Sequence, residues 1–408
     1  MPNPAHQLVY MDNHASTRVD PRVVEAMLPY FDEKYGNPHS VHAAGHEARD
    51  AVDAARQLIA NSIGADASEI VFTSGATESN NLAIRGVAER ERRRGNHIVG
   101  VATEHKAILD PLARLGRRGY DVTLLSVEQH GSPRAGWLDP QNVEDSLRDD
   151  TCLVSVMLAN NEIGVIQPLA DIAAVCKARG VLLHCDATQA VGKIPVDVGA
   201  LDIDLMSFTA HKIYGPKGIG ALYVRRRDPI VRLEPQVVGG GQQEGRRSGT
   251  LNVPGIVGFA TALKLCLDEL PRESERLAEL RNQLAANLLE QLPDVCLCGP
   301  QLDLRDADGH PLRLPGNLNL SFGNVDGEAL SLAMGNLAVS SGAACTSTDT
   351  GPSHVLLALG LGEGDARSSL RFGLGRFNTL ADVEFATSRV VQAVGDLRKL
   401  TSWPAEKV

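Results

Sequence analysis

The chain has few aromatic side chains, only 4%, and it lacks any apolar run of the roughly 18 residues that indicate a membrane-spanning helix. The first residues, MPNPAHQLVYMDNH, lack both the basic stretch and the apolar run of a secretory signal. A membrane protein and a secreted protein are therefore not expected. We expect a soluble, cytoplasmic protein.

The seven cysteines form no CxxC pair, the spacing that is typical of zinc and redox motifs. They are Cys152, Cys176, Cys185, Cys266, Cys296, Cys298 and Cys345. An odd, scattered set of cysteines suits a reducing compartment better than a disulfide-stabilised secreted domain. We expect no metal site.

The chain also lacks an excess of positive charge. It has 40 Lys and Arg against 50 Asp and Glu, which gives a formal net charge of −10. The basic stretch at residues 89–95 lies on a helical pattern and is interpreted as a solvated face. Direct binding of nucleic acid is therefore not expected.

What the chain does have is an alternation of short apolar runs with helical patterns over its first 260 residues. This alternation predicts an α/β domain in which helices cover both faces of a mostly parallel sheet. Ligands of such a sheet bind beyond the carboxyl ends of its strands. The expected strands are residues 69–73, 97–103, 121–127, 152–159, 181–187, 203–210 and 218–224.

A chain of 408 residues is long enough for two domains. A glycine-rich stretch at residues 237–255 ends the alternation, and a long helix is predicted to begin near Pro271. We expect a large α/β domain of residues 16–262. A smaller α+β domain would then consist of residues 1–15, which pack on it, and residues 263–408.

Two charged residues stand at the ends of predicted strands. Lys212 follows the strand at 203–210 and precedes glycines, so desolvation could lower its pKa and make it a Schiff-base amine, although a solvated loop lysine is the alternative. Asp186 ends an apolar strand, where an isolated Asp is most often a cap. A lysine and a carboxylate at one sheet edge are the two side chains that pyridoxal 5'-phosphate (PLP) requires. The lysine forms a Schiff base with the cofactor, and the carboxylate keeps the ring nitrogen protonated.

Two further strand ends carry polar residues. In FTSGATESNN, residues 72–81, backbone N–H groups at a helix start and the Thr77 hydroxyl can hold a phosphate; the alternative is a helix capped by Thr or Ser. His105 follows the strand at 97–103. A lone histidine is more often a satisfied polar residue, but here it could stack on a planar ring and move protons.

Eight stretches then occur in order from about residue 10 to 380: GATESNN, TEHKAIL, NNEIGVIQP, DATQAVGK, SFTAHKIYGPKG, RSGTLNVPG, SSGAACTS and LRFGLGRFN. With them the sequence closely resembles the PLP-dependent cysteine desulfurases of the aminotransferase class V group. SSGAACTS and the long loop after it are similar to the housekeeping and nitrogen-fixation type. The resemblance implies the PLP-dependent transferase fold type I.

The resemblance also implies the roles of individual residues in cofactor binding. Lys212 would bond the cofactor, Asp186 would pair with the pyridine nitrogen and His105 would stack over the ring. The ring hydroxyl would be held by Gln189 and by Asn161, with Asn160 as the less favoured choice of the pair. The phosphate would be held by Ala76, Thr77, Thr209 and His211, and by Thr250 from the neighbouring subunit of a homodimer. Thr209 stands where serine is usual, which keeps the hydroxyl.

The implied reaction converts L-cysteine to L-alanine. Arg371, with its planar fork, would clamp the substrate carboxylate with help from Asn161, and the thiolate of Cys345 would take the sulfur as a persulfide. A protein sulfur acceptor or iron–sulfur scaffold would then receive it, for iron–sulfur clusters, tRNA thiolation or cofactors. The chain ends at TSWPAEKV without the longer tail by which some family members bind a scaffold, so the acceptor stays open.

The setting of Cys345 differs from that of the other six cysteines, which are interpreted as core or incidental residues. Its neighbours are small, and the Thr/Asp/Gly/Pro run after it is interpreted as a mobile loop. We expect the loop at 344–353 to be poorly ordered or turned away from Lys212. Strand alternation points Cys185 away from the cofactor side that Asp186 faces.

Three alternatives stay open at this stage. A selenocysteine or cystine lyase and an aminotransferase share the implied fold, although an aminotransferase leaves the loop cysteine unexplained. A catalytically silent scaffold in a sulfur-transfer complex predicts the loss of a site residue, and Lys212, Asp186, His105 and Cys345 are all present.

Overall fold

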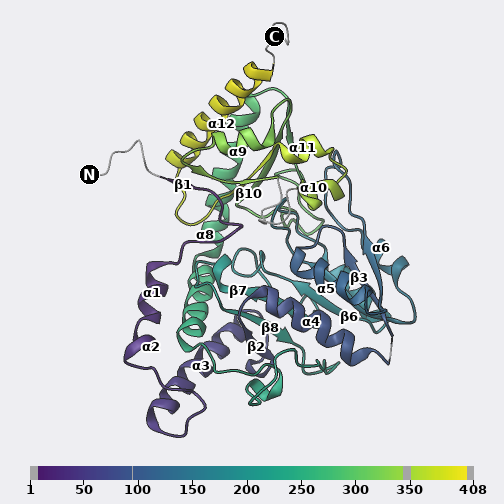
Figure 1. The fold of residues 1–408 in the computed structure, drawn as a ribbon, viewed down its shortest axis with the longest axis vertical. Coiled ribbons are helices and arrows are strands. Elements are labelled where there is room, and N and C mark those ends of the chain that lie inside the picture. Colours follow the sequence, from purple (N-terminus) through teal and green to yellow (C-terminus); the bar gives the residue numbers. More distant parts are fainter. Residues whose placement is uncertain (1–7, 94, 343–350, 402–408) are drawn as a thin grey trace.

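The structure is a computed structural model that describes residues 8–93, 95–342 and 351–401 (Figure 1). Its centre is a seven-stranded sheet of order β2-β8-β7-β6-β5-β3-β4, in which only β8 runs antiparallel to its neighbours. The strands are β2 (Ile70–Thr73), β3 (His97–Val101), β4 (Asp121–Leu125), β5 (Thr151–Met157), β6 (Leu182–Asp186), β7 (Leu205–Thr209) and β8 (Gly220–Val224). All seven predicted strands are present within two residues at each end, and the mostly parallel sheet is confirmed.

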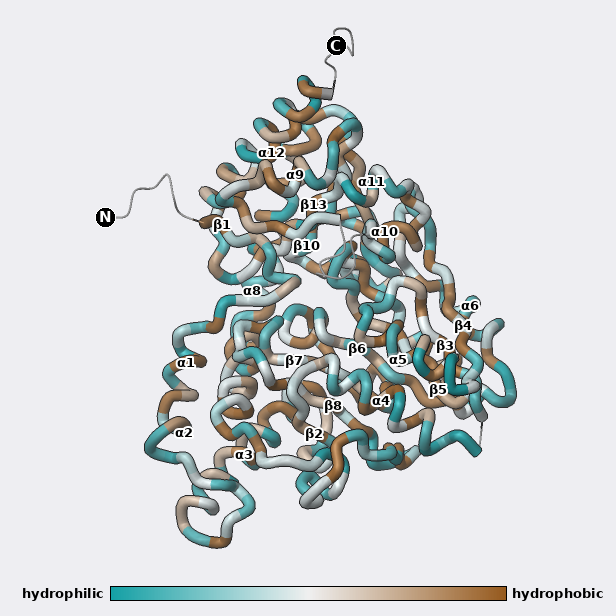
Figure 2. Tube along the Cα trace, viewed as in Figure 1, coloured by the Kyte–Doolittle hydropathy of each residue, from teal (hydrophilic) through white to brown (hydrophobic). Residues whose placement is uncertain are grey.

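Helices cover both faces of this sheet because successive strand residues point to opposite sides. In β5, Leu153 packs in the apolar cluster under α4 (Ala76–Glu91) and α5 (Lys106–Gly116). The next residue, Val154, packs in the larger cluster with α3 (Ala43–Asn61) and α7 (Leu169–Ala178). Figure 2 draws β3 and β5 mostly in brown, the colour of apolar residues, as expected for strands that are buried on both faces.

Shorter elements complete this region. They are the helices α1 (Pro21–Met27), α2 (Pro29–Asp32) and α6 (Pro140–Ser146), and the 3₁₀ turns η2 (Ala67–Glu69), η3 (Ala210–Lys212) and η4 (Gln243–Gly245). The turn η3 directly follows β7.

A second region is built on an antiparallel sheet of order β12-β13-β10-β9. Its strands are β9 (Val295–Leu297), β10 (Asn317–Phe322), β12 (Ser340–Ser341) and β13 (Ser369–Gly373). Its helices are α9 (Gly327–Ala333), α10 (His354–Ala358), α11 (Glu363–Arg367) and α12 (Leu380–Thr401). The N-terminal segment contacts this region through β1 (Val9–Tyr10), which pairs with β11 (Leu337–Ala338).

The predicted helix start near Pro271 is wrong. Helix α8 (Val253–Gln291) begins inside the glycine-rich stretch, where the Asn252 side chain accepts a hydrogen bond from the N–H of Gly255. A proline inside a helix removes one backbone donor and usually ends the helix. Here the helix continues because its two halves are packed in different apolar clusters, Phe259 in the first and Leu284 in the second. Helix α8 therefore joins the two regions.

Within the ranges that the structure describes, every helix is too short or too polar to cross a bilayer.

Candidate active site

A cavity of about 710 Å³ lies beyond the carboxyl ends of the parallel strands and reaches β13 of the second region. The walls include ten of the residues that the sequence singled out: Ala76, Thr77, His105, Asn161, Asp186, Gln189, Thr209, His211, Lys212 and Arg371. Two others are not among them. Thr250 is exposed and lies outside the walls, and Cys345, with most of the loop at 344–353, lies outside the described residues.

Lys212 ends the turn η3, and its amine points at the N-terminal segment. Nζ donates to the carbonyl oxygens of His14 and Ala15, both at 2.6 Å. Burial and the positive charge of Arg371 lower the pKa of Lys212 to about 8. The solvated-loop alternative is therefore wrong, because the amine lies in the cavity. The segment at 14–15, which the sequence did not single out, supplies both of its acceptors.

Asp186 stands at the carboxyl end of β6 with its side chain 5% exposed. Oδ2 accepts a hydrogen bond from Nδ2 of Asn80 at 2.8 Å, and Oδ1 accepts one from the N–H of Thr188 at 2.9 Å. Each carboxylate oxygen keeps a second lone pair, so the group can still accept a proton donor from the cavity. Asn80, on α4, is a partner that the sequence pattern did not reveal.

The start of α4 forms an anion cradle. The alternative of a helix capped by Thr or Ser is wrong, because the N-cap is Gly75 and no side chain caps the first turn. The N–H groups of Ala76 and Thr77 are thus left for a ligand. Gly75 has φ +149°, and β8 approaches it so closely that a Cβ on Gly220 would lie 2.7 Å from its Cα. Thr209 and His211 line the cavity beside this cradle.

The two neighbouring asparagines differ in their surroundings. The Asn160 side chain is fully buried, donates to the carbonyl of Thr103 at 3.0 Å and accepts from the N–H groups of Glu162 and Ile163. It therefore closes a turn. Asn161 lines the cavity, which favours it over Asn160 as a ligand-binding residue.

Gln189 and His105 line the cavity, and hydrogen bonds to neighbouring residues hold both side chains in place. Oε1 of Gln189 pairs with Nδ1 of His14 at 3.2 Å and Nζ of Lys193 at 2.5 Å. Nδ1 of His105 accepts from the N–H of Ala107 at 3.0 Å. Burial lowers the pKa of His105, so its ring is neutral at pH 7 and carries its proton on Nε2.

Arg371 reaches the cavity from β13. Its Nη2 donates to Oδ1 of Asp12 at 2.9 Å and to Oγ of Ser340 at 2.6 Å. Its Nε is buried and has no hydrogen-bond partner among the described residues. A guanidinium that is oriented on one side and unpaired on the other suits a carboxylate ligand. Asp12, which orients it, was not identified from the sequence.

The described cysteines offer no reactive thiol in the cavity. Cys185 is buried in the larger apolar cluster, on the side of β6 away from the cavity as predicted, and burial raises the pKa of its thiol well above the usual value. Burial likewise raises the pKa of Cys176, Cys266 and Cys298 to about 12. Cys296 is exposed on β9.

A model of the aminotransferase class-V family matches residues 9–385. The chain belongs to this family. A relative from Anaeromyxobacter dehalogenans named "Cysteine desulfurase IscS" is 51% identical over 96% of this chain and 94% of its own length. A solved NifS-like protein superposes with a TM-score of 0.86 at 36% identity, over 96% of this chain and all of the other. The structure titled "SspA in complex with cysteine" has a TM-score of 0.77 at 35% identity and covers 91% of this chain and 99% of its own.

These matches show that this class-V protein is an enzyme, a PLP-dependent cysteine desulfurase of fold type I. The cavity fits the cofactor. The uncapped N–H groups of Ala76 and Thr77 suit its phosphate, Asp186 suits its ring nitrogen, and the amine of Lys212 suits its aldehyde.

The lowered pKa of Lys212 predicts how PLP capture by the apoenzyme depends on pH. Only the neutral amine attacks an aldehyde, so capture should fall below about pH 8 and level off above it, whereas an ordinary lysine would gain rate up to about pH 10.5. In Arg371→Gln a positive charge is lost, the pKa of Lys212 rises, and the midpoint moves to higher pH. Stopped-flow absorbance after PLP is mixed with the apoenzyme measures the pH midpoint of capture. The control is the same measurement with the side-chain amine of free lysine. A midpoint near pH 10 in both the wild type and Arg371→Gln would contradict the prediction.

Proposed function

We propose that this enzyme converts L-cysteine to L-alanine and holds the sulfur as a persulfide on Cys345 for delivery to a protein acceptor. The observation that carries the proposal is one cavity with an amine of lowered pKa, Lys212, and a guanidinium with an unpaired Nε, Arg371. An amino acid needs both, one group for its carboxylate and one for its α-proton.

The cofactor, when bound, supplies an electron sink for the charge that develops at the substrate α-carbon. In the proposal its phosphate is held by Ala76, Thr77, Thr209 and His211, and by Thr250 of the partner subunit. Asp186 would keep the proton on the ring nitrogen, Asn161 and Gln189 would bind the ring hydroxyl, and His105 would stack on the ring. The direct bond from Asn80 supports the role of Asp186, because it fixes the carboxylate.

The substrate is oriented by Arg371, which lines the cavity together with Asn161 and whose buried Nε has no hydrogen-bond partner among the described residues. Its α-proton is taken by the amine of Lys212, which is neutral in a large fraction of molecules near pH 8. His105, neutral with a proton on Nε2, can give that proton to the substrate.

Sulfur transfer follows by nucleophilic attack. The thiolate of Cys345 attacks the substrate sulfur, a new S–S bond forms, and the Cβ–S bond breaks with its electron pair left on the carbon skeleton. Protonation of that skeleton gives alanine. An ordinary thiol has a pKa of about 8.5 and is only a few per cent ionised at neutral pH, so a base must take the thiol proton first.

The proposal includes a homodimer in the cytoplasm, with a sulfur-acceptor protein or iron–sulfur scaffold as a further partner. Val41 and Val238 are 86% and 79% exposed, and association of two subunits would cover such apolar surface. None of the six described cysteines forms a disulfide, which suits a reducing compartment. The two apolar clusters support a large PLP-binding domain of residues 16–262 and a small domain of residues 1–15 and 263–408.

Mass spectrometry tests the proposed function directly. After incubation of the holoenzyme with L-cysteine, the peptide that contains Cys345 should gain the mass of one sulfur atom. The peptide that contains the exposed Cys296 is the internal control and should stay unmodified. Active turnover with an unmodified Cys345 would contradict the persulfide route.

A further inference from the structure

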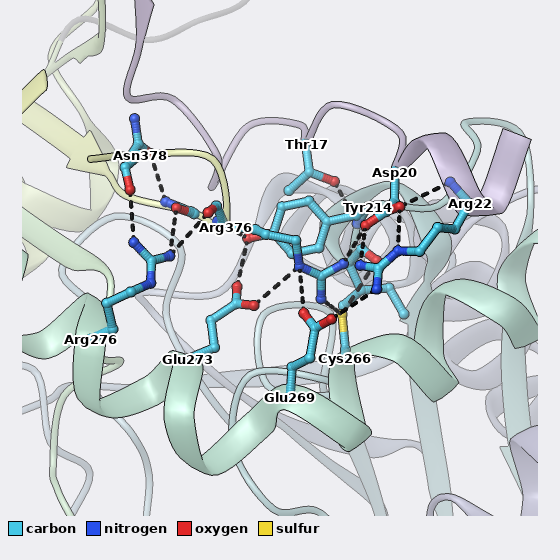
Figure 3. Close-up of polar contacts among 12 residues, drawn as sticks. Thr17, Asp20, Arg22, Tyr214, Cys266, Glu269, Glu273, Arg276, Arg376 and Asn378 are labelled. Carbon is cyan, nitrogen blue, oxygen red and sulfur yellow. Dashed lines mark hydrogen bonds and ion pairs between the residues drawn. The ribbon is translucent and has the colours of Figure 1, made fainter.

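Arg376 lies in the loop after β13, the strand that carries Arg371, and its side chain is only 9% exposed. Figure 3 shows its guanidinium pointing away from the second region into a polar cluster on α8 and the N-terminal segment. This cluster is not part of the cavity walls. A buried arginine at the junction of two regions needs a structural or functional reason, because burying a charge is costly.

The guanidinium of Arg376 is held from three segments. Its Nη1 lies 2.8 Å from Oδ2 of Asp20, and its Nε lies 3.1 Å from Oε2 of Glu273 on α8. Its central carbon stacks 4.4 Å from the ring centroid of Tyr214. Ion pairs with Arg22 and Arg376 hold the pKa of Asp20 well below its usual value, so the acceptor stays charged.

Tyr214 links this cluster to the catalytic turn, because it follows Lys212 by two positions. Its backbone is in the left-handed region, with φ +64°, and its N–H donates to Oγ1 of Thr17 at 2.7 Å. Its hydroxyl accepts from the backbone N–H of Arg376 at 2.7 Å and donates to Oε1 of Glu273 at 3.1 Å. One side chain thus ties the lysine turn to the loop after β13.

We infer that Arg376 and Tyr214 are positioning residues that set the separation between the amine of Lys212 and the guanidinium of Arg371. The inference rests on the proposed function, in which Arg371 binds the substrate carboxylate. Because Arg376 and Arg371 belong to one short segment, a shift of the loop moves the carboxylate-binding group relative to the amine. Directional ion pairs and hydrogen bonds hold one geometry, whereas an apolar contact tolerates sliding.

Changes at the Arg376 junction should affect the binding of the substrate and of the cofactor differently. Three of the residues proposed to hold the phosphate, Ala76, Thr77 and Thr209, lie in the first region at the start of α4 and the end of β7, and among the described residues they make no hydrogen bond or ion pair with Arg376 or its loop. The fourth, His211, lies on the turn η3 beside Lys212. A looser junction should therefore weaken substrate binding and leave PLP affinity in place.

The test compares Arg376→Met, Tyr214→Phe and a matched control in the holoenzyme. Arg376→Met should raise KM for L-cysteine about tenfold and Tyr214→Phe about threefold, because a misplaced Arg371 binds the substrate carboxylate less tightly. The dissociation constant for L-alanine, read from the absorbance of the bound cofactor, should rise in parallel. The dissociation constant for PLP should stay within about twofold of the wild type. The control is Arg272→Met, because Arg272 is an exposed arginine on α8, next to Glu273 but outside this cluster; it should leave KM unchanged.

Two results would overturn the inference: an unchanged KM in Arg376→Met, or a loss of PLP affinity that matches the loss of L-alanine affinity. If Arg376→Met does not fold, Tyr214→Phe decides, because it removes only a hydroxyl group. Arg371→Gln is the reference variant. If it leaves KM unchanged, the proposed substrate binding itself fails, and the inference fails with it; if it raises KM while Arg376→Met and Tyr214→Phe do not, only the inference fails.

Discussion

Lys212→Ala is expected to lower kcat for alanine formation by roughly 10⁴-fold, the upper range for loss of a positioned acid–base group. The carbonyls of His14 and Ala15 fix this amine in the cavity, and its loss removes the group that is proposed to take the α-proton. Alanine formation by holoenzyme and the absorbance of bound PLP measure the effect. The absorbance should change from that of PLP joined to lysine to that of the free aldehyde.

The control for Lys212→Ala is Lys217→Ala. Lys217 is an exposed lysine on the wall of the same cavity, so this variant removes a similar charge without touching the buried amine. It should keep kcat within about threefold, as expected for a surface substitution. Equal losses in the two variants, or a Lys212→Ala protein that keeps most of its activity, would show that the amine of Lys212 is not the catalytic base.

Cys345→Ala is expected to have the second-largest effect, a loss of about 10³-fold or more in alanine and sulfide release, because Cys345 is the proposed nucleophile and none of the described cysteines lines the cavity. Of the five buried cysteines among the described residues, four have thiols with raised pKa values, and their thiolates are therefore scarce. Binding of L-cysteine should persist, since it depends on Lys212 and Arg371. The measurement is alanine release in the presence of a thiol reductant, together with the absorbance change on addition of L-cysteine.

Cys296→Ala is the control for Cys345→Ala, because Cys296 is the exposed cysteine among those described. It should release alanine at the wild-type rate. Undiminished alanine release by Cys345→Ala would instead indicate the lyase alternative, in which sulfur leaves without an enzyme persulfide.

Much of the candidate site was predictable because one rule connects strand order to ligand position. Parallel strands end at one edge of a sheet, so residues just after predicted strands come together there. Asp186, His105 and Lys212 follow three such strands, and all line the cavity. The start of α8 was not predictable in the same way. Pro271 signals a helix start locally, and only the packing of both halves of α8 in separate clusters overrides that signal.

The sequence by itself determined the class of fold, the strand-end residues and the family resemblance, because these depend on local periodicity and on motifs of a few residues. The tertiary structure alone decided which side chains support them. Asp12 and Arg371 are 359 positions apart and pair at 2.9 Å, Asn80 meets Asp186 across 106 positions, and Tyr214 meets Arg376 across 162. No local pattern encodes such pairs, because the packing of distant segments determines which side chains meet.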